Sequence, residues 1–234
     1  MKTRLKNRDN STEMAGKGAS MMEQNEILSR VDHTLLTPTA TWDQVRALCD
    51  EGKQFGVASV CIPPRYVKRA NDYAGGLKIC TVIGFPNGYA TPEVKVFETE
   101  DAIRDGADEI DMVINQGLAK AGDWEGVLTE IKAVKESCKG RILKVIIEAC
   151  NFTQEEKITL CRVVSMSGAE FIKTSTGFAA GGATVEDVRL FREHISPDMR
   201  IKAAGGIRTF EQAQAMLEAG ADRIGASALV ALAR

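Results

Sequence analysis

Short apolar segments rich in β-branched residues alternate with longer amphipathic stretches along most of the chain. A brief apolar run bounded by turn residues is typical of a buried strand, whereas apolar positions spaced three or four apart indicate a helix. The pattern predicts eight strands, at 28–34, 59–62, 77–84, 108–115, 141–149, 170–175, 200–205 and 221–226. Strands that alternate with helices in this way predict βα units and a parallel sheet.

The stretches between these segments carry signals for helix starts and ends. The clearest helix is expected over 123–138, where the apolar positions repeat every three or four residues. Capping boxes predict three helix starts, at Thr41–Gln44, Thr153–Glu156 and Thr209–Gln212. Proline at 92 suits the first position of a further helix. In the phrases DGADEI, SGAEFI and AGADRI, a glycine ends a helix just before the next strand.

Eight βα units in roughly 210 residues predict a closed (β/α)8 barrel, an α/β fold, near the short end of its size range. An open doubly wound sheet is the alternative, but such sheets usually carry a G-x-G-x-x-G turn after the first strand, and none follows here. No linker interrupts the alternation, so residues 23–234 are expected to form one catalytic domain. Residues 1–22 are predicted to be a polar extension, because no apolar segment of a secretion signal follows their basic residues.

Composition narrows the class of protein. Hydrophobic residues make up 44% of the 234 residues and charged residues 26%, which argues against wholesale disorder. The formal net charge of −2 does not favour nucleic acid as a partner, and no apolar run reaches the length of a membrane span. The six cysteines form no CxxC pair and indicate reduced thiols of a cytoplasmic protein. With only two histidines, we expect no metal site. No cofactor is expected either.

Ionisable residues lie on one face of four predicted strands. Side chains alternate between the two faces of a strand, so Asp111, Lys144, Lys173 and Lys202 lie opposite the purely apolar face of each strand. The apolar face would pack against the helices. The ionisable groups would then point into the barrel, near the carboxyl ends of the strands.

A buried lysine cluster has two explanations. Lysine is among the residues least often buried, and a salt-bridge cluster with Asp111 and Glu148 would explain its presence here. The alternative is that one amine is kept neutral, because burial and neighbouring cations both lower the pKa of a lysine. A neutral amine attacks carbonyl groups and forms a Schiff base.

Glycine-rich loops follow the last three predicted strands. AAGGIRT (203–209) leaves the seventh strand and GAS (225–227) leaves the eighth. In barrels of this kind these two loops commonly hold a phosphate group. STGFAAGGAT (175–184) follows the sixth strand and could close over a ligand. Tight turns and plain loop flexibility are the alternative explanation of the same glycines.

Seven motifs, in order, give the chain a family resemblance over about residues 25–230. They are VDHTLL (31–36), SVCI (59–62), EIDMVIN (109–115), LKVIIE (143–148), FIKTSTGF (171–178), KAAGGIRT (202–209) and RIGAS (223–227). With these motifs the chain resembles the deoxyribose-phosphate aldolases. The resemblance implies a metal-free (β/α)8 barrel that is a class I aldolase. Its reaction would be the reversible cleavage of 2-deoxy-D-ribose 5-phosphate to acetaldehyde and D-glyceraldehyde 3-phosphate.

The resemblance also implies roles for individual residues. Lys173 matches the Schiff-base lysine, Lys202 the lysine that lowers its pKa, Asp111 the proton-relay carboxylate and Lys144 a lysine that assists Asp111. The matching substrate-binding positions are Asp32, Thr34, Cys61 and Thr176. The matching phosphate-binding positions are Gly177, Gly205, Gly206, Arg208, Gly225 and Ser227. The expected partner is a phosphorylated sugar, and whether the chain forms a dimer or a tetramer stays open.

Two positions depart from the family pattern. Phe178 follows Gly177 where some members carry lysine, and Ala228 follows Ser227 where many carry a second serine. Both changes would remove contacts to the phosphate. Two other functions remain in view: another Schiff-base enzyme of phosphorylated sugars, such as a transaldolase-like or ketose-phosphate aldolase, and a phosphate-binding barrel without catalysis.

Overall fold

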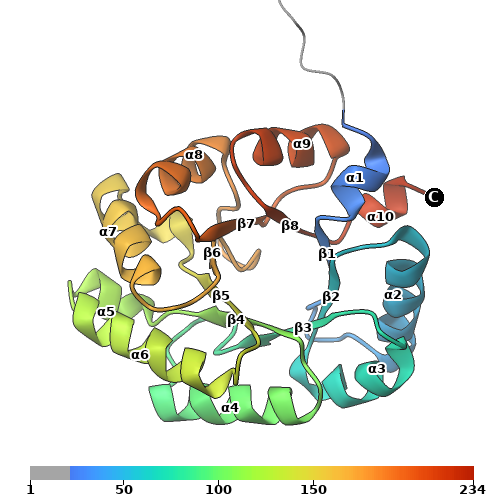
Figure 1. The fold of residues 1–234 in the computed structure, drawn as a ribbon, viewed down its shortest axis with the longest axis horizontal. Helices are drawn as coiled ribbons and strands as arrows, with labels where there is room; N and C mark the ends of the chain where they lie inside the picture. Colours follow the sequence, from blue (N-terminus) through green and yellow to red (C-terminus); the bar gives the residue numbers. More distant parts are fainter. Residues whose placement is uncertain (1–21) are drawn as a thin grey trace, which may run out of the picture.

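Residues 22–234 are described by a computed structural model, and they form a closed barrel of eight parallel strands in chain order (Figure 1). The strands are β1 (Val31–Thr34), β2 (Ser59–Ile62), β3 (Ile79–Ile83), β4 (Glu109–Val113), β5 (Ile142–Ile146), β6 (Phe171–Lys173), β7 (Arg200–Ala204) and β8 (Arg223–Ala226). Pairing of β8 with β1 closes the ring. The predicted (β/α)8 barrel is therefore confirmed, and the open sheet is excluded.

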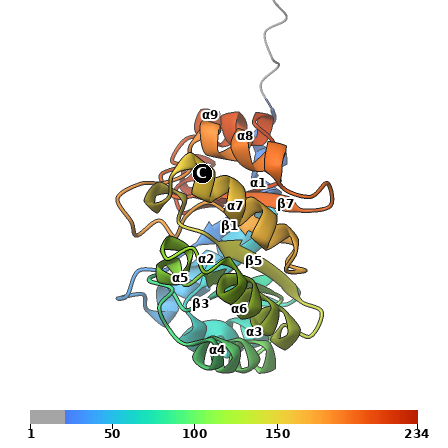
Figure 2. The same ribbon diagram turned by 90° about the vertical axis from the view of Figure 1, so that its left-hand side faces the viewer.

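Helices surround the ring of strands, and Figure 2 shows α5, α6 and α7 packed along its outer side. The helices are α1 (Gln24–Leu28), α2 (Trp42–Phe55), α3 (Val67–Ala74), α4 (Pro92–Arg104), α5 (Gln116–Lys120), α6 (Trp124–Ser137), α7 (Gln154–Ser165), α8 (Val185–His194), α9 (Phe210–Glu218) and α10 (Leu229–Leu232). Two 3-10 turns, η1 (Pro64–Tyr66) and η2 (Ala149–Asn151), follow β2 and β5.

The local signals in the sequence act as expected. All three capping boxes form, at the starts of α2, α7 and α9, and Pro92 is the first residue of α4. The glycines at 106, 168 and 220 have φ values of 100°, 84° and 112°, which side chains with a Cβ rarely adopt. They end their helices and let the chain turn into β4, β6 and β8.

The first strand is shorter than the sequence pattern predicts. The apolar residues Ile27 and Leu28 belong to the end of α1, and β1 begins only at Val31. The apolar composition around residue 28 was misleading because both residues lie in a short helix and are buried as part of it, not in the sheet. The predicted polar extension at 1–22 lies, except for Met22, outside the described residues.

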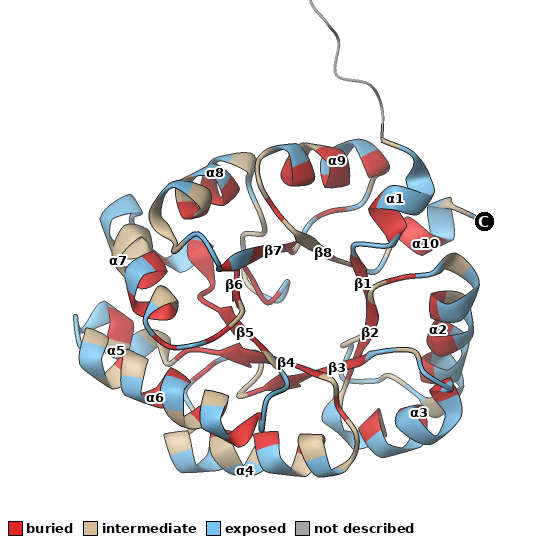
Figure 3. Cartoon of the chain, in the orientation of Figure 1, coloured by how far each residue is buried: buried red, intermediate tan, exposed pale blue. Residues whose placement is uncertain are grey.

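The main hydrophobic core lies between the barrel and the helices, and Figure 3 shows buried residues on the strands and on the inner faces of the helices. A second, smaller apolar cluster lies apart from it, formed by Cys61, Cys80 and Val82, with Leu36 and Phe85 packed against them. Among residues 22–234, no helix is both long and apolar enough to span a membrane.

A buried ion pair fixes the loops at one side of the barrel mouth. The Lys95 ammonium donates to Glu130 at 2.7 Å and to the carbonyl oxygens of Gly88 and Val113, at 2.7 and 2.8 Å. Because every donor of this buried amine has a partner, the desolvation cost of the charge is offset. The contact joins α4 and α6 to the loop that follows β3 and to the last residue of β4.

Candidate active site

The sheet register brings the predicted ionisable residues together inside the barrel. Asp111 on β4 is the direct neighbour of Lys144 on β5, and Lys173 on β6 is the neighbour of Lys202 on β7. The alternate residues of these strands, such as Leu143 and Val145, belong to the main core against the helices. The predicted division into an apolar outer face and an ionisable inner face is confirmed.

Three lysine amines converge on the carboxylate of Asp111. Lys144 donates to Oδ1 at 2.9 Å, and both Lys173 and Lys202 donate to Oδ2 at 2.7 Å. The thiol of Cys80 lies 3.2 Å from Oδ1. All five of these side chains are buried, so the contacts between them are only weakly screened by solvent.

Further acidic groups lie at the same depth. Asp32 pairs with Lys202 and, through Oδ1, with Arg223 at 2.5 Å, while Glu109 pairs with Lys144 at 2.6 Å. Asp32 also accepts the hydroxyl of Ser59 at 2.7 Å. The described part of this cluster thus contains three carboxylates (Asp32, Glu109, Asp111) and four basic groups (Lys144, Lys173, Lys202, Arg223).

The pKa values of the cluster follow from its ion pairs. Burial alone would raise the pKa of Asp111, but the three lysines outweigh burial and hold the pKa well below its usual value. Burial alone would lower the pKa of Lys202, but Asp111 and Asp32 outweigh it and raise that pKa. Burial alone would also lower the pKa of Lys144, but neighbouring acidic groups, above all Asp111, raise that pKa well above its usual value. Lys144 and Lys202 are therefore permanent cations near neutral pH.

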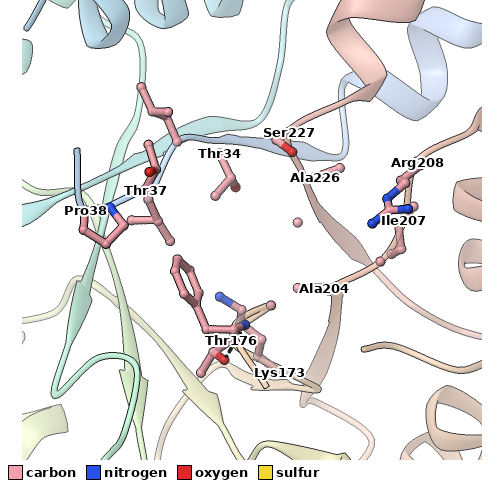
Figure 4. A pocket seen from close by; sticks show the side chains of 17 residues that line it. Thr34, Thr37, Pro38, Lys173, Thr176, Ala204, Ile207, Arg208, Ala226 and Ser227 are labelled. Carbon is pink, nitrogen blue, oxygen red and sulfur yellow. Dashed lines mark hydrogen bonds between the residues drawn. The ribbon is translucent and has the colours of Figure 1, made fainter. Parts of the chain in front are cut away.

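An open pocket of about 410 Å³ lies at the carboxyl ends of the strands, and Lys173 is the lysine of the cluster that lines it (Figure 4). The loop after β1 forms one wall, and the loops after β6, β7 and β8 form the others. Lys173 is 3% exposed, whereas Lys144 and Lys202 are fully buried, at 0%. Only the Lys173 amine among these three is therefore placed to meet a ligand.

The six residues predicted to bind phosphate all line this pocket: Gly177, Gly205, Gly206, Arg208, Gly225 and Ser227. Their loops touch one another. A Cβ at Gly182 would lie 2.3 Å from the carbonyl oxygen of Gly205, and the Ala183 amide donates to that same oxygen at 3.0 Å. At this position glycine is required for the close approach of two loops, and flexibility alone does not account for it.

The four predicted substrate-binding residues lie at two depths. Thr34 and Thr176 line the pocket. Asp32 lies below it in the ion-pair cluster, and Cys61 lies in the small apolar cluster beside Cys80. Glu148, which the sequence offered as a salt-bridge partner for the lysines, does not join their cluster. Its carboxylate contacts Thr176 instead.

Several site residues escaped the sequence analysis. Glu109 stands two positions before Asp111, so strand alternation could have placed it on the same inner face. Arg223 on β8 lies directly opposite Lys202 on β7 in the sheet, and this register cannot be read from the sequence. The loop Leu35–Pro38 adds an apolar wall to the pocket, and Phe178 faces it, 49% exposed and edge-on to Phe85 at 5.3 Å between ring centroids.

Two groups of side chains have the spacing of a metal site among the described residues. They are Cys61, Cys80 and Asp111, and Asp32, Cys80 and Glu109, with ligand atoms within 4.8 Å of one another. Their carboxylates already accept from lysine amines at 2.6–2.9 Å. A divalent cation at either position would meet several ammonium groups at short range, so electrostatic repulsion opposes its binding.

A (β/α)8 barrel with a lysine cluster under a pocket at the carboxyl ends of its strands is the arrangement of a class I aldolase, which attacks a carbonyl group with a lysine amine. Residues 26–232 match the model of the DeoC/LacD family of aldolases. The chain belongs to this family.

Curated relatives and solved structures agree with this assignment. The chain is 52% identical over 204 residues to deoxyribose-phosphate aldolase of Clostridioides difficile, covering 87% of the chain and 93% of that protein. It is also 52% identical over 214 residues to the Streptococcus pyogenes serotype M4 protein of the same name, covering 91% and 96%. The deoxyribose phosphate aldolase of Aeropyrum pernix, described as tetrameric, superposes with a TM-score of 0.84 at 35% identity, covering 89% of each chain.

Proposed function

We propose that the protein cleaves 2-deoxy-D-ribose 5-phosphate reversibly to acetaldehyde and D-glyceraldehyde 3-phosphate, through a Schiff base on Lys173. The names of its relatives support the substrate. The observation that carries the chemistry is the placement of one lysine at the floor of the pocket, with two permanently charged lysines sealed beneath it.

Lys173 has fewer carboxylate contacts than the other basic groups of the cluster. With every group ionised, three carboxylates face four basic groups. Lys144, Lys202 and Arg223 each contact two or more carboxylates, whereas Lys173 contacts only Asp111, through an oxygen that Lys202 shares. The amine that faces the pocket is thus the one with the fewest ion-pair contacts in the cluster, which supports its role as the nucleophile.

The reaction follows from this arrangement. The Lys173 amine adds to the C1 aldehyde of the open-chain sugar, and loss of water gives a protonated imine. As the C2–C3 bond breaks, its electron pair moves into the imine and forms an enamine, while Asp111 accepts the proton of the C3 hydroxyl. Glyceraldehyde 3-phosphate leaves, the enamine is protonated at C2, and hydrolysis of the imine releases acetaldehyde. Such proton transfer contributes about 10²–10⁴-fold to a rate.

Borohydride trapping tests this proposal. Reduction in the presence of acetaldehyde or deoxyribose 5-phosphate should attach a two-carbon or five-carbon fragment to Lys173, located by peptide mass spectrometry. A fragment on Lys144 or Lys202 would contradict the assignment. Turnover of a ketose phosphate, with trapping of dihydroxyacetone phosphate in place of acetaldehyde, would show a different aldolase, and failure to turn over any substrate would leave a binding protein.

Arg208 and the glycine-rich loops are proposed to hold the phosphate. The Arg208→Ala variant should raise the KM for deoxyribose 5-phosphate and leave that for deoxyribose nearly unchanged. Arg208 is exposed and its charge is screened by solvent. We therefore expect kcat/KM for deoxyribose 5-phosphate to fall about tenfold, the low end of the range for a charge-assisted hydrogen bond. The measurement is kcat/KM for both sugars, and equal losses would place Arg208 outside the phosphate site.

The proposed setting is that of a cytoplasmic homo-oligomer. All six cysteines are free in the structure, and five of them are buried, which fits a reducing compartment. A homo-oligomer is supported by the tetrameric relative from Aeropyrum pernix. We propose no cofactor, since the lysine cluster supplies the chemistry described above.

A further inference from the structure

Glu148 is a buried carboxylate that the reaction described above does not use. It follows β5, is 2% exposed, and has no ion-pair partner among the described residues. Its backbone adopts φ 55° and ψ 64°, the left-handed region that residues other than glycine rarely occupy. A left-handed backbone at a residue other than glycine and a buried carboxylate without an ion-pair partner are both costly, and such features gather at functional sites.

The carboxylate of Glu148 is directed entirely at one residue, Thr176. The Thr176 amide lies 3.2 and 3.3 Å from the two carboxylate oxygens, and the Thr176 hydroxyl donates to Oε2 at 2.5 Å. Backbone hydrogen bonds on either side of Glu148 hold it in place: the Ile147 amide donates to Lys173, and the Ala149 amide donates to Thr174. Glu148 is therefore fixed to the segment that begins at the Schiff-base lysine.

These contacts leave the Thr176 hydroxyl with one free position. A hydroxyl has one proton to donate and two lone pairs that accept. The proton goes to Glu148, and one lone pair accepts the Phe178 amide at 3.0 Å. The remaining lone pair has no hydrogen-bond partner among the described residues, and Thr176 lines the pocket. Toward a ligand, Thr176 is thus a hydrogen-bond acceptor and not a donor.

Thr176 lies between the two ends of the proposed substrate. It stands beside Lys173 in Figure 4, and the glycines of the phosphate loops begin at the next residue, Gly177. A sugar that is joined to Lys173 at C1 and held through its phosphate at C5 would have its middle carbons beside Thr176. Its C4 hydroxyl becomes the hydroxyl next to the aldehyde carbon of glyceraldehyde 3-phosphate.

We propose that Glu148 is a positioning residue that fixes the Thr176 hydroxyl as an acceptor, so that the site selects acceptor aldehydes bearing a hydrogen-bond donor on the carbon next to the carbonyl. This inference rests on the proposed aldolase function and deepens it. The selected group is a hydroxyl that donates to Thr176, and an ether oxygen at the same position gains no such bond.

A Glu148→Gln variant should change this polarity. If the glutamine oxygen accepts the Thr176 amide, its NH₂ group faces the Thr176 hydroxyl, which must then turn its own proton toward the pocket. The opposite amide orientation sets two donors, the glutamine NH₂ and the Thr176 amide, against each other. In the first orientation, the Thr176 hydroxyl donates its proton toward the pocket. A hydroxyl oxygen and an ether oxygen of the ligand can accept this proton equally well.

The test compares glycolaldehyde with methoxyacetaldehyde as acceptors for acetaldehyde, by the ratio of their kcat/KM values. We expect the preference for glycolaldehyde to fall about three- to tenfold in Glu148→Gln, the effect of one neutral hydrogen bond. Thr176→Val should lower the preference for glycolaldehyde by the same factor, and the double variant should lower it no further. Thr176→Ser should keep the wild-type preference. General damage to the fold would lower both rates and leave the ratio unchanged.

Glu170→Gln is the matched control, because Glu170 caps the Leu143 amide at the opposite end of the same two strands. It should keep the wild-type ratio. If the wild type condenses both aldehydes and Glu148→Gln keeps its preference, the inference about Glu148 is wrong while the aldolase function stands. If the wild type condenses neither aldehyde and traps no imine, the proposed function itself fails, and the inference with it.

Discussion

Replacing Lys173 with leucine should give a folded protein with no measurable aldolase turnover. Removing the nucleophile of a covalent mechanism typically costs about 10⁴-fold or more. The fold should survive, because the remaining cluster keeps three carboxylates against the three cations Lys144, Lys202 and Arg223. Steady-state kinetics and thermal unfolding of the same preparation measure the two effects separately.

Lys135→Leu provides the control for this variant. Lys135 also pairs with a carboxylate, Glu170, at 2.5 Å, but on the outer side of the barrel and away from the pocket. It should lose an ion pair and keep its turnover. Substantial activity in Lys173→Leu, with the Lys135 variant behaving normally, would rule out the Schiff-base role of Lys173.

Replacing Asp111 with asparagine should have the largest effect on stability. The change leaves the amines of Lys144, Lys173 and Lys202 without the carboxylate on which they converge. Breaking a buried ion pair from one side typically costs about 3–5 kcal/mol, because the remaining charge stays buried. Turnover should also fall about 10²–10⁴-fold, because Asp111 is the proposed proton acceptor. Urea unfolding at pH 7 measures the first effect.

The stability difference between wild type and Asp111→Asn should depend on pH. The pKa of Asp111 is held well below its usual value, with the three lysines outweighing burial, so its charge stabilises the folded state. This contribution is complete above the unfolded pKa of about 3.9 and is lost as the pH falls toward the folded pKa. The difference should be constant from pH 7 to about 5 and shrink below about 4. A difference that stays constant down to pH 3 would show that the ion pairs of Asp111 do not stabilise the fold.

Local sequence signals predicted most of the helices and strands of the fold. The threonines at 41, 153 and 209 and the glycines at 106, 168 and 220 act within one turn of chain, where hydrogen bonding and backbone sterics are set by neighbouring residues. The strand segments were recognisable for a similar reason, since a parallel strand buried on both faces needs an almost continuous apolar sequence. Residue 28 misled because an apolar residue beside a strand can equally end a short helix.

The alternation of side chains along the strands predicted part of the active site. It placed Lys144, Lys173 and Lys202 on the inner face with Asp111, and register then brought them into contact. It could not show which carboxylates would pair with which lysines. Glu148 is the clearest case: alternation puts it on the same face as Lys144, yet a left-handed backbone at the end of β5 directs its carboxylate to Thr176.

The sequence by itself determined the order of strands and helices, the closed barrel, the inner face of ionisable residues and the family, because these depend on local periodicity and on motifs. Only the tertiary structure decided that Lys173 lines the pocket while Lys144 and Lys202 are fully buried, and that Asp32 and Cys61 do not line it. Depth along the barrel axis depends on strand tilt and on loops that meet from distant parts of the chain, and neither is encoded in the alternation of a single strand.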